Sequence, residues 1–273
     1  MDLKLESQFC AITFLADGNI CVIFRGTDNT IVGWKEDLNM SFMPVVPGQT
    51  QAAEYLEKAS VAQSGSIIVA GHSKGGNFAA FAAAFCQEWA QRRVERIYNF
   101  DGPGFCHERV EAEGYEKICD RLYSYIPQSS LIGMMLEQKG TEVTVRSNEF
   151  AVMQHDLYSW EILRDQLRRV EKVNVGSEWV DRTLKNWLED RPADKRAKVI
   201  DAVFEILNAT DKTTMSDISK NLPSSIIAMF KYWHTMENEE QQNIWDSARS
   251  LIRSAGENVG EFKEYFREMK WKQ

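Results

Sequence analysis

The sequence has 273 residues, of which 44% are hydrophobic and 26% are charged, and its formal net charge is -8 at pH 7. This composition is ordinary for a soluble globular protein and argues against a disordered chain or a disulfide scaffold. The acidic balance disfavours nucleic acid as a partner. No secretory signal, CxxC spacing or run of about 18 apolar residues is present, so we expect a cytoplasmic protein with reduced cysteines and no transmembrane segment.

Short apolar runs rich in β-branched residues alternate with helical stretches over the first 150 residues. This alternation is typical of a mostly parallel sheet flanked by helices, so we expect an α/β fold. The predicted strands are FCAITFL, ICVIF, SIIVAG, RIYNF, LYSYI and TEVTVRS. Helices are predicted over residues 50–63 and 77–94, and the aromatic stripe of the second, which ends at Trp89, is expected to face the core.

After Trp160 the pattern changes to amphipathic helices, and we predict a boundary near residue 165. Residues 1–165 would form an α/β core, and residues 166–273 a helical extension packing on it. The predicted helices cover residues 162–173, 177–190, 193–207, 216–236 and 239–256. The apolar segment 222–230, interrupted by Pro223, is expected either to form a lid over a substrate pocket or to bury a helix against the sheet.

The sequence GHSKG at residues 71–75 has the form G-x-S-x-G, and it follows a buried-strand run and precedes a helix of small residues. This setting is typical of a nucleophile elbow, in which the two glycines let strand and helix approach closely and the serine hydroxyl projects free of the sheet. We therefore predict that Ser73 is a nucleophile and that the backbone N–H of Lys74 is an oxyanion donor. The alternative is a glycine-rich turn with an incidental serine.

The segment FRGTD at residues 24–28 ends the predicted strand upstream of the elbow, where these folds place the loop that donates a second oxyanion hydrogen bond. Thr27 offers both a backbone N–H and a hydroxyl for this task. In the alternative, the segment is a strand-ending turn in which Asp28 caps the next helix. Arg25, Trp34 and Asp37 are interpreted as scaffold, forming an ion pair and an aromatic plug below the loop rather than substrate contacts.

Among the four histidines, His155 is the predicted general base, because it follows the last strand and so fits the chain order Ser, Asp, His. The alternatives are an ordinary loop histidine beside a cap formed by Asp156, or His107 as the base. For the acid we favour Asp101, which ends the RIYNF strand and emerges at the same sheet edge as Ser73. Otherwise Asp101 bonds its own backbone in an Asp-Gly-Pro-Gly turn, and the site is a Ser–His dyad.

Residues 9–160 resemble the class 3, fungal-lipase-like branch of the α/β-hydrolases through FRGTD, the following GWKEDLNMSF, GHSKGGN, DGPGF and a QHD-W segment. They are closer still to a bacterial family of unknown function within that branch. The resemblance implies an α/β-hydrolase fold and lipase-like esterase chemistry. Carried over by position, Ser73 is the nucleophile, Thr27 and Lys74 line the oxyanion hole, and His155 is the base.

Two features depart from this resemblance. Class 3 lipases place the acid just after the next-to-last strand, but residues 125–131 hold no carboxylate and Ser130 stands in the place of the aspartate. Members of the bacterial family also carry further residues before FRGTD, so a truncated N-terminus is one interpretation.

The sequence therefore predicts a serine hydrolase that cleaves carboxylic esters of a small acyl or lipid-like substrate through a Ser-His-Asp triad or a Ser–His dyad. A thioesterase, amidase or acyltransferase would use the same nucleophile, since the elbow does not determine the leaving group. A non-catalytic binding protein with a hydrolase fold is the alternative from another class. No cluster suggests a metal site and no fingerprint suggests a nucleotide cofactor, so we expect neither.

Overall fold

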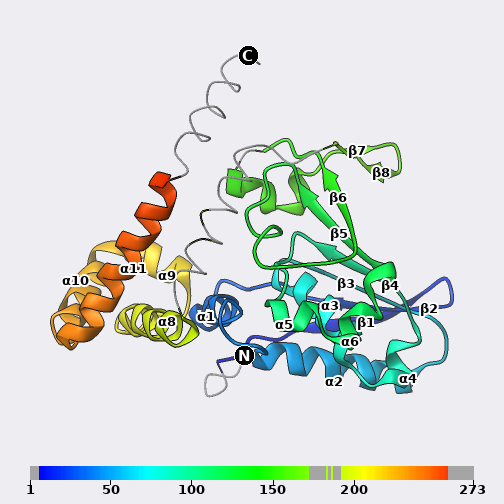
Figure 1. Ribbon diagram of the computed structural model, residues 1–273, viewed down its shortest axis with the longest axis horizontal. Helices are drawn as coiled ribbons and strands as arrows, with labels where there is room; N and C mark the ends of the chain where they lie inside the picture. Colours follow the sequence, from blue (N-terminus) through cyan, green and yellow to red (C-terminus); the bar gives the residue numbers. More distant parts are fainter. Residues whose placement is uncertain (1–5, 150, 172–182, 184–185, 187–191, 258–273) are drawn as a thin grey trace, which may run out of the picture.

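A six-stranded sheet forms the centre of the molecule, which is described by a computed structural model over residues 6–149, 151–171, 183, 186 and 192–257 (Figure 1). The strands lie in chain order across the sheet, and only the first pair is antiparallel. They are β1 (Ala11–Ala16), β2 (Asn19–Phe24), β3 (Ile67–His72), β4 (Val94–Phe100), β5 (Leu122–Pro127) and β6 (Thr141–Val145). The expected α/β architecture with a mostly parallel sheet is confirmed.

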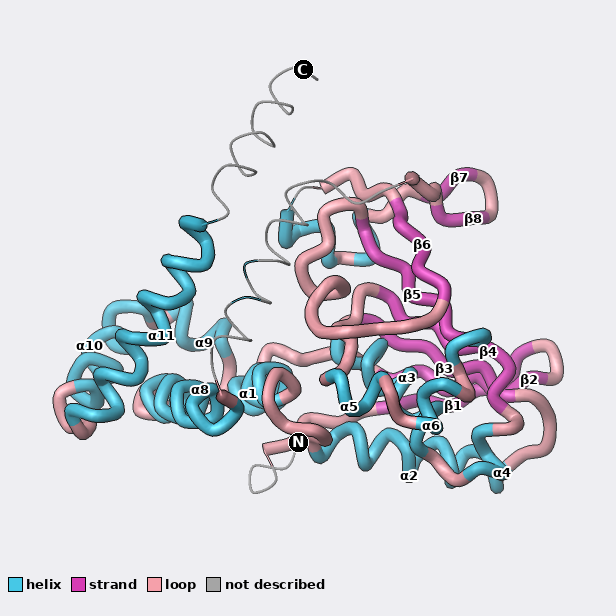
Figure 2. Tube along the Cα trace, viewed as in Figure 1, coloured by secondary structure: helices cyan, strands magenta, loops and turns pink. Residues whose placement is uncertain are grey.

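Helices between the strands gather on one face of the sheet, as Figure 2 shows for α2, α4 and α6. Each parallel crossover steps in the same direction, and because such crossovers are right-handed, their helices fall on the same side. Phe78 of α3 packs there against inward side chains of the strands. On the opposite face, Ile12 and Phe14 of β1 are exposed. The connecting helices are α1 (Ile31–Asn39), α2 (Pro47–Ala62), α3 (Lys74–Phe85), α4 (Glu88–Gln91), α5 (His107–Val110), α6 (Glu113–Glu116) and the 3-10 turn η1 (Cys119–Arg121).

The helix predicted over residues 77–94 is wrong in its second half. The helix α3 ends at Phe85, and Cys86 is extended. The side-chain amide of Gln91 donates to the carbonyl oxygens of Ala83 (3.0 Å) and Ala84 (2.8 Å), which satisfies two acceptors that the end of a helix leaves open. Trp89 therefore lies in the separate turn α4, is 41% exposed and does not extend the buried stripe.

The helix predicted over residues 162–173 is also wrong, because this segment forms an antiparallel hairpin of β7 (Ile162–Leu163) and β8 (Gln166–Leu167). The chain around it pairs with β6: the N–H of Arg146 donates to the carbonyl of Arg168 (2.8 Å), and the N–H of Val170 donates to that of Thr144 (3.0 Å). The edge of β6 offers backbone partners, and pairing with it overrides a helical pattern that the side chains alone suggest.

The helical extension packs on the core through α1. Its described helices are α8 (Ala193–Asn208), α9 (Met215–Lys220), α10 (Leu222–Trp233) and α11 (Asn238–Glu257), and the single helix expected over residues 216–236 is divided at Asn221. A buried apolar cluster joins Ile31 of α1 to Ile200, Phe204 and Ile218. The helix predicted over residues 177–190 falls outside the described residues except at positions 183 and 186.

Helix α10 does not bury the apolar segment 222–230 against the sheet, so that expectation is wrong, and the alternative of a lid stays a prediction. Helix α10 packs against α8 and α9 rather than the sheet, and its side chains at Leu222, Ile226, Ile227 and Phe230 are about half exposed or more. Within the described part of the chain, no helix is both long enough and apolar enough to cross a bilayer.

Candidate active site

Ser73 lies on a strained turn between β3 and α3, with φ 57° and ψ -130°. A positive φ on a residue other than glycine costs about 1–3 kcal/mol and persists only where the surroundings impose it. Here the N–H of Ser73 donates to the carbonyl of Phe100 (2.9 Å). A methyl group on Gly71 would collide with the backbone of Gly75, and one on Gly75 would collide with the carbonyl of Phe24. The close strand–helix approach expected from the two glycines is present.

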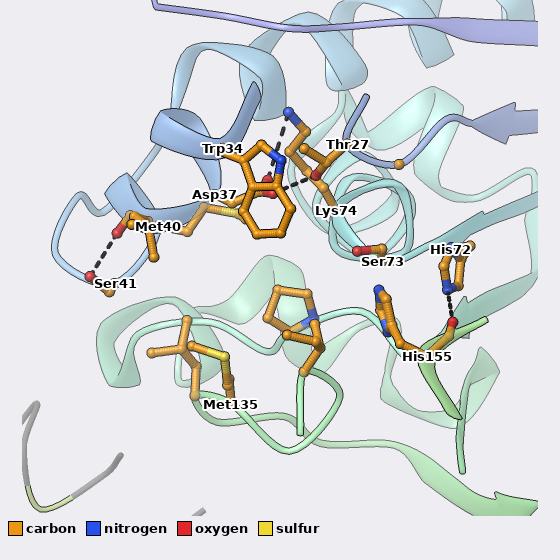
Figure 3. A pocket seen from close by; sticks show the side chains of 15 residues that line it. Thr27, Trp34, Asp37, Met40, Ser41, His72, Ser73, Lys74, Met135 and His155 are labelled. Carbon is orange, nitrogen blue, oxygen red and sulfur yellow. Dashed lines mark hydrogen bonds and ion pairs between the residues drawn. The ribbon is translucent and has the colours of Figure 1, made fainter. Parts of the chain in front are cut away.

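Ser73 opens into a pocket of about 300 Å³ that Thr27, Lys74 and His155 also line. Figure 3 shows the imidazole of His155 facing the side of the pocket that carries Ser73. Most of the remaining wall is apolar, and no described residue of the helical extension contributes to it. The apolar side chains are those of Trp34, Leu38, Met40, Pro103, Ile132, Met135 and Leu136.

His155 ends the 3-10 turn η2 (Ala151–His155), and its Nδ1 lies 2.7 Å from Oδ2 of Asp101. Asp101 directly follows β4 and is only 1% exposed. Because a carboxylate accepts hydrogen bonds, the proton of a neutral His155 belongs on Nδ1. The other ring nitrogen, Nε2, is then free to accept a proton.

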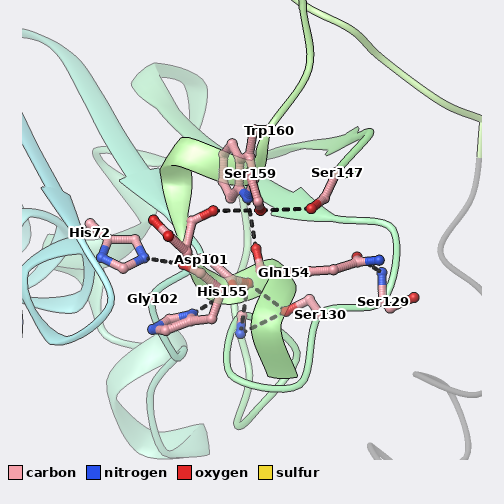
Figure 4. Close-up of polar contacts among 12 residues, drawn as sticks. His72, Asp101, Gly102, Ser129, Ser130, Ser147, Gln154, His155, Ser159 and Trp160 are labelled. Atoms are coloured by element: carbon pink, nitrogen blue, oxygen red, sulfur yellow. Dashed lines mark hydrogen bonds and ion pairs between the residues drawn. The ribbon is translucent and has the colours of Figure 1, made fainter. Parts of the chain in front are cut away.

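Two further donors hold the Asp101 carboxylate, and Figure 4 shows one of them, Ser130. The hydroxyl of Ser130 donates to Oδ1 (2.5 Å), and the N–H of Gly133 donates to the same oxygen (3.1 Å). Asp101 does not bond its own turn. Instead, Asn99 accepts from the N–H of Gly102 (2.9 Å). Ser130, which stands where the resemblance would put an aspartate, therefore contacts the carboxylate that comes from the neighbouring strand.

The hydroxyl of Thr27 does not serve the predicted oxyanion role, because its Oγ1 donates to Oδ2 of Asp37 (2.5 Å). The backbone N–H of Thr27 is then the group that can donate a hydrogen bond to an oxyanion.

Burial raises the pKa of Asp37 to about 6, although Lys74 and the Thr27 hydroxyl oppose the shift. Trp34 is 48% exposed and lines the pocket, so its interpretation as a plug below the loop is wrong.

Lys74 begins α3, where helical geometry leaves the first backbone N–H groups without intrahelical acceptors. Its side chain is buried, with Nζ 3.0 Å from Oε2 of Glu36 and 3.7 Å from Oδ1 of Asp37. The carboxylate of Glu36 also accepts from the N–H groups of Gln8 (2.9 Å) and Gly48 (2.7 Å). The sequence analysis did not identify Glu36. Its only signal in the sequence is that it forms an acidic pair with Asp37 after FRGTD.

The other sequence candidates lie outside this pocket. His107 is exposed on α5, where its hydrogen bond to the carboxylate of Glu137 (3.0 Å) raises its pKa. His234 follows α10 and packs on Phe230. Asp156 caps the 3-10 turn η3 (Leu157–Ser159), so the cap expected beside His155 is present.

Comparison with known proteins identifies the family. A family model described as Mbeg1-like matches residues 1–205 of the 273. No curated protein matches the chain. The Mbeg1-like family is related to lipase-like proteins of the α/β-hydrolase class. The chain therefore belongs to the Mbeg1-like family.

Proposed function

We propose that this protein is a serine hydrolase with a lipase-like α/β-hydrolase fold, which cleaves carboxylic esters with an uncharged, apolar acyl group. The observation that carries the proposal is a strained Ser73 sharing one pocket with His155, whose Nδ1 contacts the buried carboxylate of Asp101. A nucleophile, a base and a group that orients the base are the three parts that acyl transfer requires.

In the proposed reaction, Oγ of Ser73 attacks the ester carbonyl carbon while Nε2 of His155 takes the hydroxyl proton. The backbone N–H groups of Lys74 and Thr27 stabilise the negative charge on the carbonyl oxygen. His155 then protonates the departing alcohol, which leaves an acyl group on Ser73. Water, deprotonated by His155, attacks this acyl group. The bond between the acyl carbon and Oγ of Ser73 then breaks as His155 returns the proton to Oγ, which releases the acid and restores the serine. Asp101 stabilises the imidazolium that forms in both steps.

The pocket supports an acyl group of limited length. Its volume of about 300 Å³ lies at the lower end of the range for small-molecule sites. The side chains of Leu38, Met135 and Leu136 offer an apolar surface, whereas the charged end of Lys74 is buried against Glu36 and faces no substrate. The site therefore fits uncharged acyl chains of short or medium length better than long or charged acyl groups.

The test combines p-nitrophenyl esters of graded length, from acetate to palmitate, with a fluorophosphonate probe. We expect wild type to react with the probe and to hydrolyse short and medium esters, and Ser73→Ala to do neither while unfolding at the same urea concentration. The exposed Ser64 gives a matched control as Ser64→Ala.

The outcomes separate the alternatives. Labelling without hydrolysis of any ester indicates a thioester or amide substrate for the same serine. Absence of labelling in wild type contradicts the enzyme proposal and favours a binding protein. The contact between Asp101 and His155 supports the enzyme proposal over a binding protein, because it supplies an acid although residues 125–131 hold none.

A further inference from the structure

His72 is the last residue of β3 and the neighbour of Ser73. Its Nε2 lies 2.7 Å from the backbone carbonyl oxygen of His155, which is 83 residues further along the chain, and the two rings are 4.5 Å apart between centroids (Figure 3). A carbonyl oxygen can only accept, so Nε2 of His72 carries the proton and donates it. The strand that holds Ser73 thereby also holds the backbone of His155.

The loop that carries His155 is held at separate points. Its neighbour Gln154 accepts from the N–H of Ser129 (2.8 Å) through its side chain and from the indole of Trp160 (2.8 Å) through its carbonyl. The His155 ring is held by Asp101 (2.7 Å). These contacts tie the loop to the end of β5, to η3 and to β4, and the bond from His72 ties it to the strand of the nucleophile.

We propose that His72 is a positioning residue, whose Nε2–H holds the His155 carbonyl and so sets the position of the His155 ring relative to the Ser73 hydroxyl. The inference rests on the proposed function and extends it to a residue that takes no part in proton transfer. Proton transfer demands heavy atoms within about 3 Å of each other, and misplacement by about 1 Å can cost about 100-fold in rate.

The surroundings of His72 suit a neutral donor. Burial, and after it the charge of the neighbouring His155, lower the pKa of His72, while the hydrogen bond to the His155 backbone and then the carboxylates of Asp101 and Asp156 oppose the shift. The lowered pKa favours the neutral form of His72 beside the imidazolium that His155 forms during the proposed reaction. A neutral ring keeps the hydrogen bond without placing a second positive charge beside that imidazolium.

Variants that separate the donor from the ring test this role. We expect His72→Phe to lower kcat about 10- to 100-fold with KM nearly unchanged, because the substrate pocket remains while the base is displaced. His72→Ala removes the same donor without a bulky ring. His72→Gln should retain most of the wild-type kcat, since its side-chain amide can donate to the carbonyl. His107→Gln, at an exposed site, is the matched control.

A second measurement needs no substrate. The Nδ1 proton of His155, bonded to Asp101, should give a low-field proton NMR signal in wild type and in His72→Gln, and a shifted or broadened signal in His72→Phe and His72→Ala. An unchanged signal and unchanged kcat in both donor-free variants would overturn the proposal. Loss of activity in His72→Gln as large as in His72→Phe would also overturn it, because the ring itself would then be required.

These results also separate two kinds of failure. If wild type hydrolyses no ester, the proposed function fails, while the NMR signals still report whether His72 positions His155. If wild type is active and the signals are insensitive to His72, only the positioning role fails.

Discussion

The α/β core and the described part of the helical extension differ in the charged side chains that they bury. At the carboxyl end of the sheet, the core buries polar and charged groups such as Asp101, Lys74 and Glu36, each with hydrogen-bond or ionic partners. The extension buries a small apolar cluster against α1 and leaves much of α10 exposed, with Phe230 at 62%. Burying charge costs free energy unless partners are supplied, and in the core these partners bring charged groups together beside Ser73. We therefore expect substitutions in the core to change the rate, the stability or both, and substitutions in the extension to change stability alone.

The largest effect is expected at Asp101. Asp101→Asn should lower kcat about 10⁴-fold, because an amide favours the wrong imidazole tautomer and cannot support the imidazolium. Steady-state kinetics on a short p-nitrophenyl ester measure this loss. Asp156→Asn is the control, since Asp156 caps η3 without contacting the His155 ring in the described hydrogen bonds. If Asp101→Asn keeps more than about a third of the rate, the site is a dyad.

The buried ion pair of Lys74 and Glu36 is the next site. Lys74→Met should lower the free energy of unfolding by about 3–5 kcal/mol, because it leaves the carboxylate of Glu36 buried without its cation. Adding Glu36→Gln should recover part of that loss, and urea denaturation of both single variants and the double variant gives the coupling. Additive losses would mean that the two side chains do not stabilise each other.

Phe204 of α8 tests the extension. Phe204→Ala should lower the free energy of unfolding by about 3 kcal/mol, because it opens a cavity in the cluster shared with α1. The exposed Phe230 gives the matched control, and Phe230→Ser should change stability by less than about 0.5 kcal/mol. Neither variant should alter the acyl-chain preference. A changed preference in Phe230→Ser would show that α10 reaches the substrate and would break the contrast between the two regions.

The smallest effect is a pH dependence from Asp37. Its folded pKa of about 6 lies above the ordinary value of 3.8, so between these two values the folded state binds more protons than the unfolded state. The contribution of Asp37 to the free energy of unfolding is therefore largest below about pH 4, falls as the pH rises to about 6, and is constant above that pH. Compared with Asp37→Asn, wild type should lose on the order of 2 kcal/mol across that interval. Urea denaturation at several pH values measures the difference, and parallel curves would contradict the shift.

The local patterns of the sequence were enough to predict the six strands, the elbow at Ser73 and the sheet edge at which Asp101 emerges. Strand and turn patterns depend on interactions within a few residues, and parallel strands bring their carboxyl ends to one edge by construction. The site residues named from those patterns lie together, although their catalytic roles stay predictions.

Other features depend on contacts between distant segments, which no local pattern encodes. Asp101 meets His155 across 54 residues, and Lys74 meets Glu36 across 38. The chain around the β7–β8 hairpin pairs with the edge of β6 where a helix was predicted. Helix α10 packs against α8 and α9, although one face of the sheet keeps exposed apolar side chains at Ile12 and Phe14. Only tertiary packing decides such outcomes, because a helical or apolar pattern states what a segment can bury and not which surface is available to bury it.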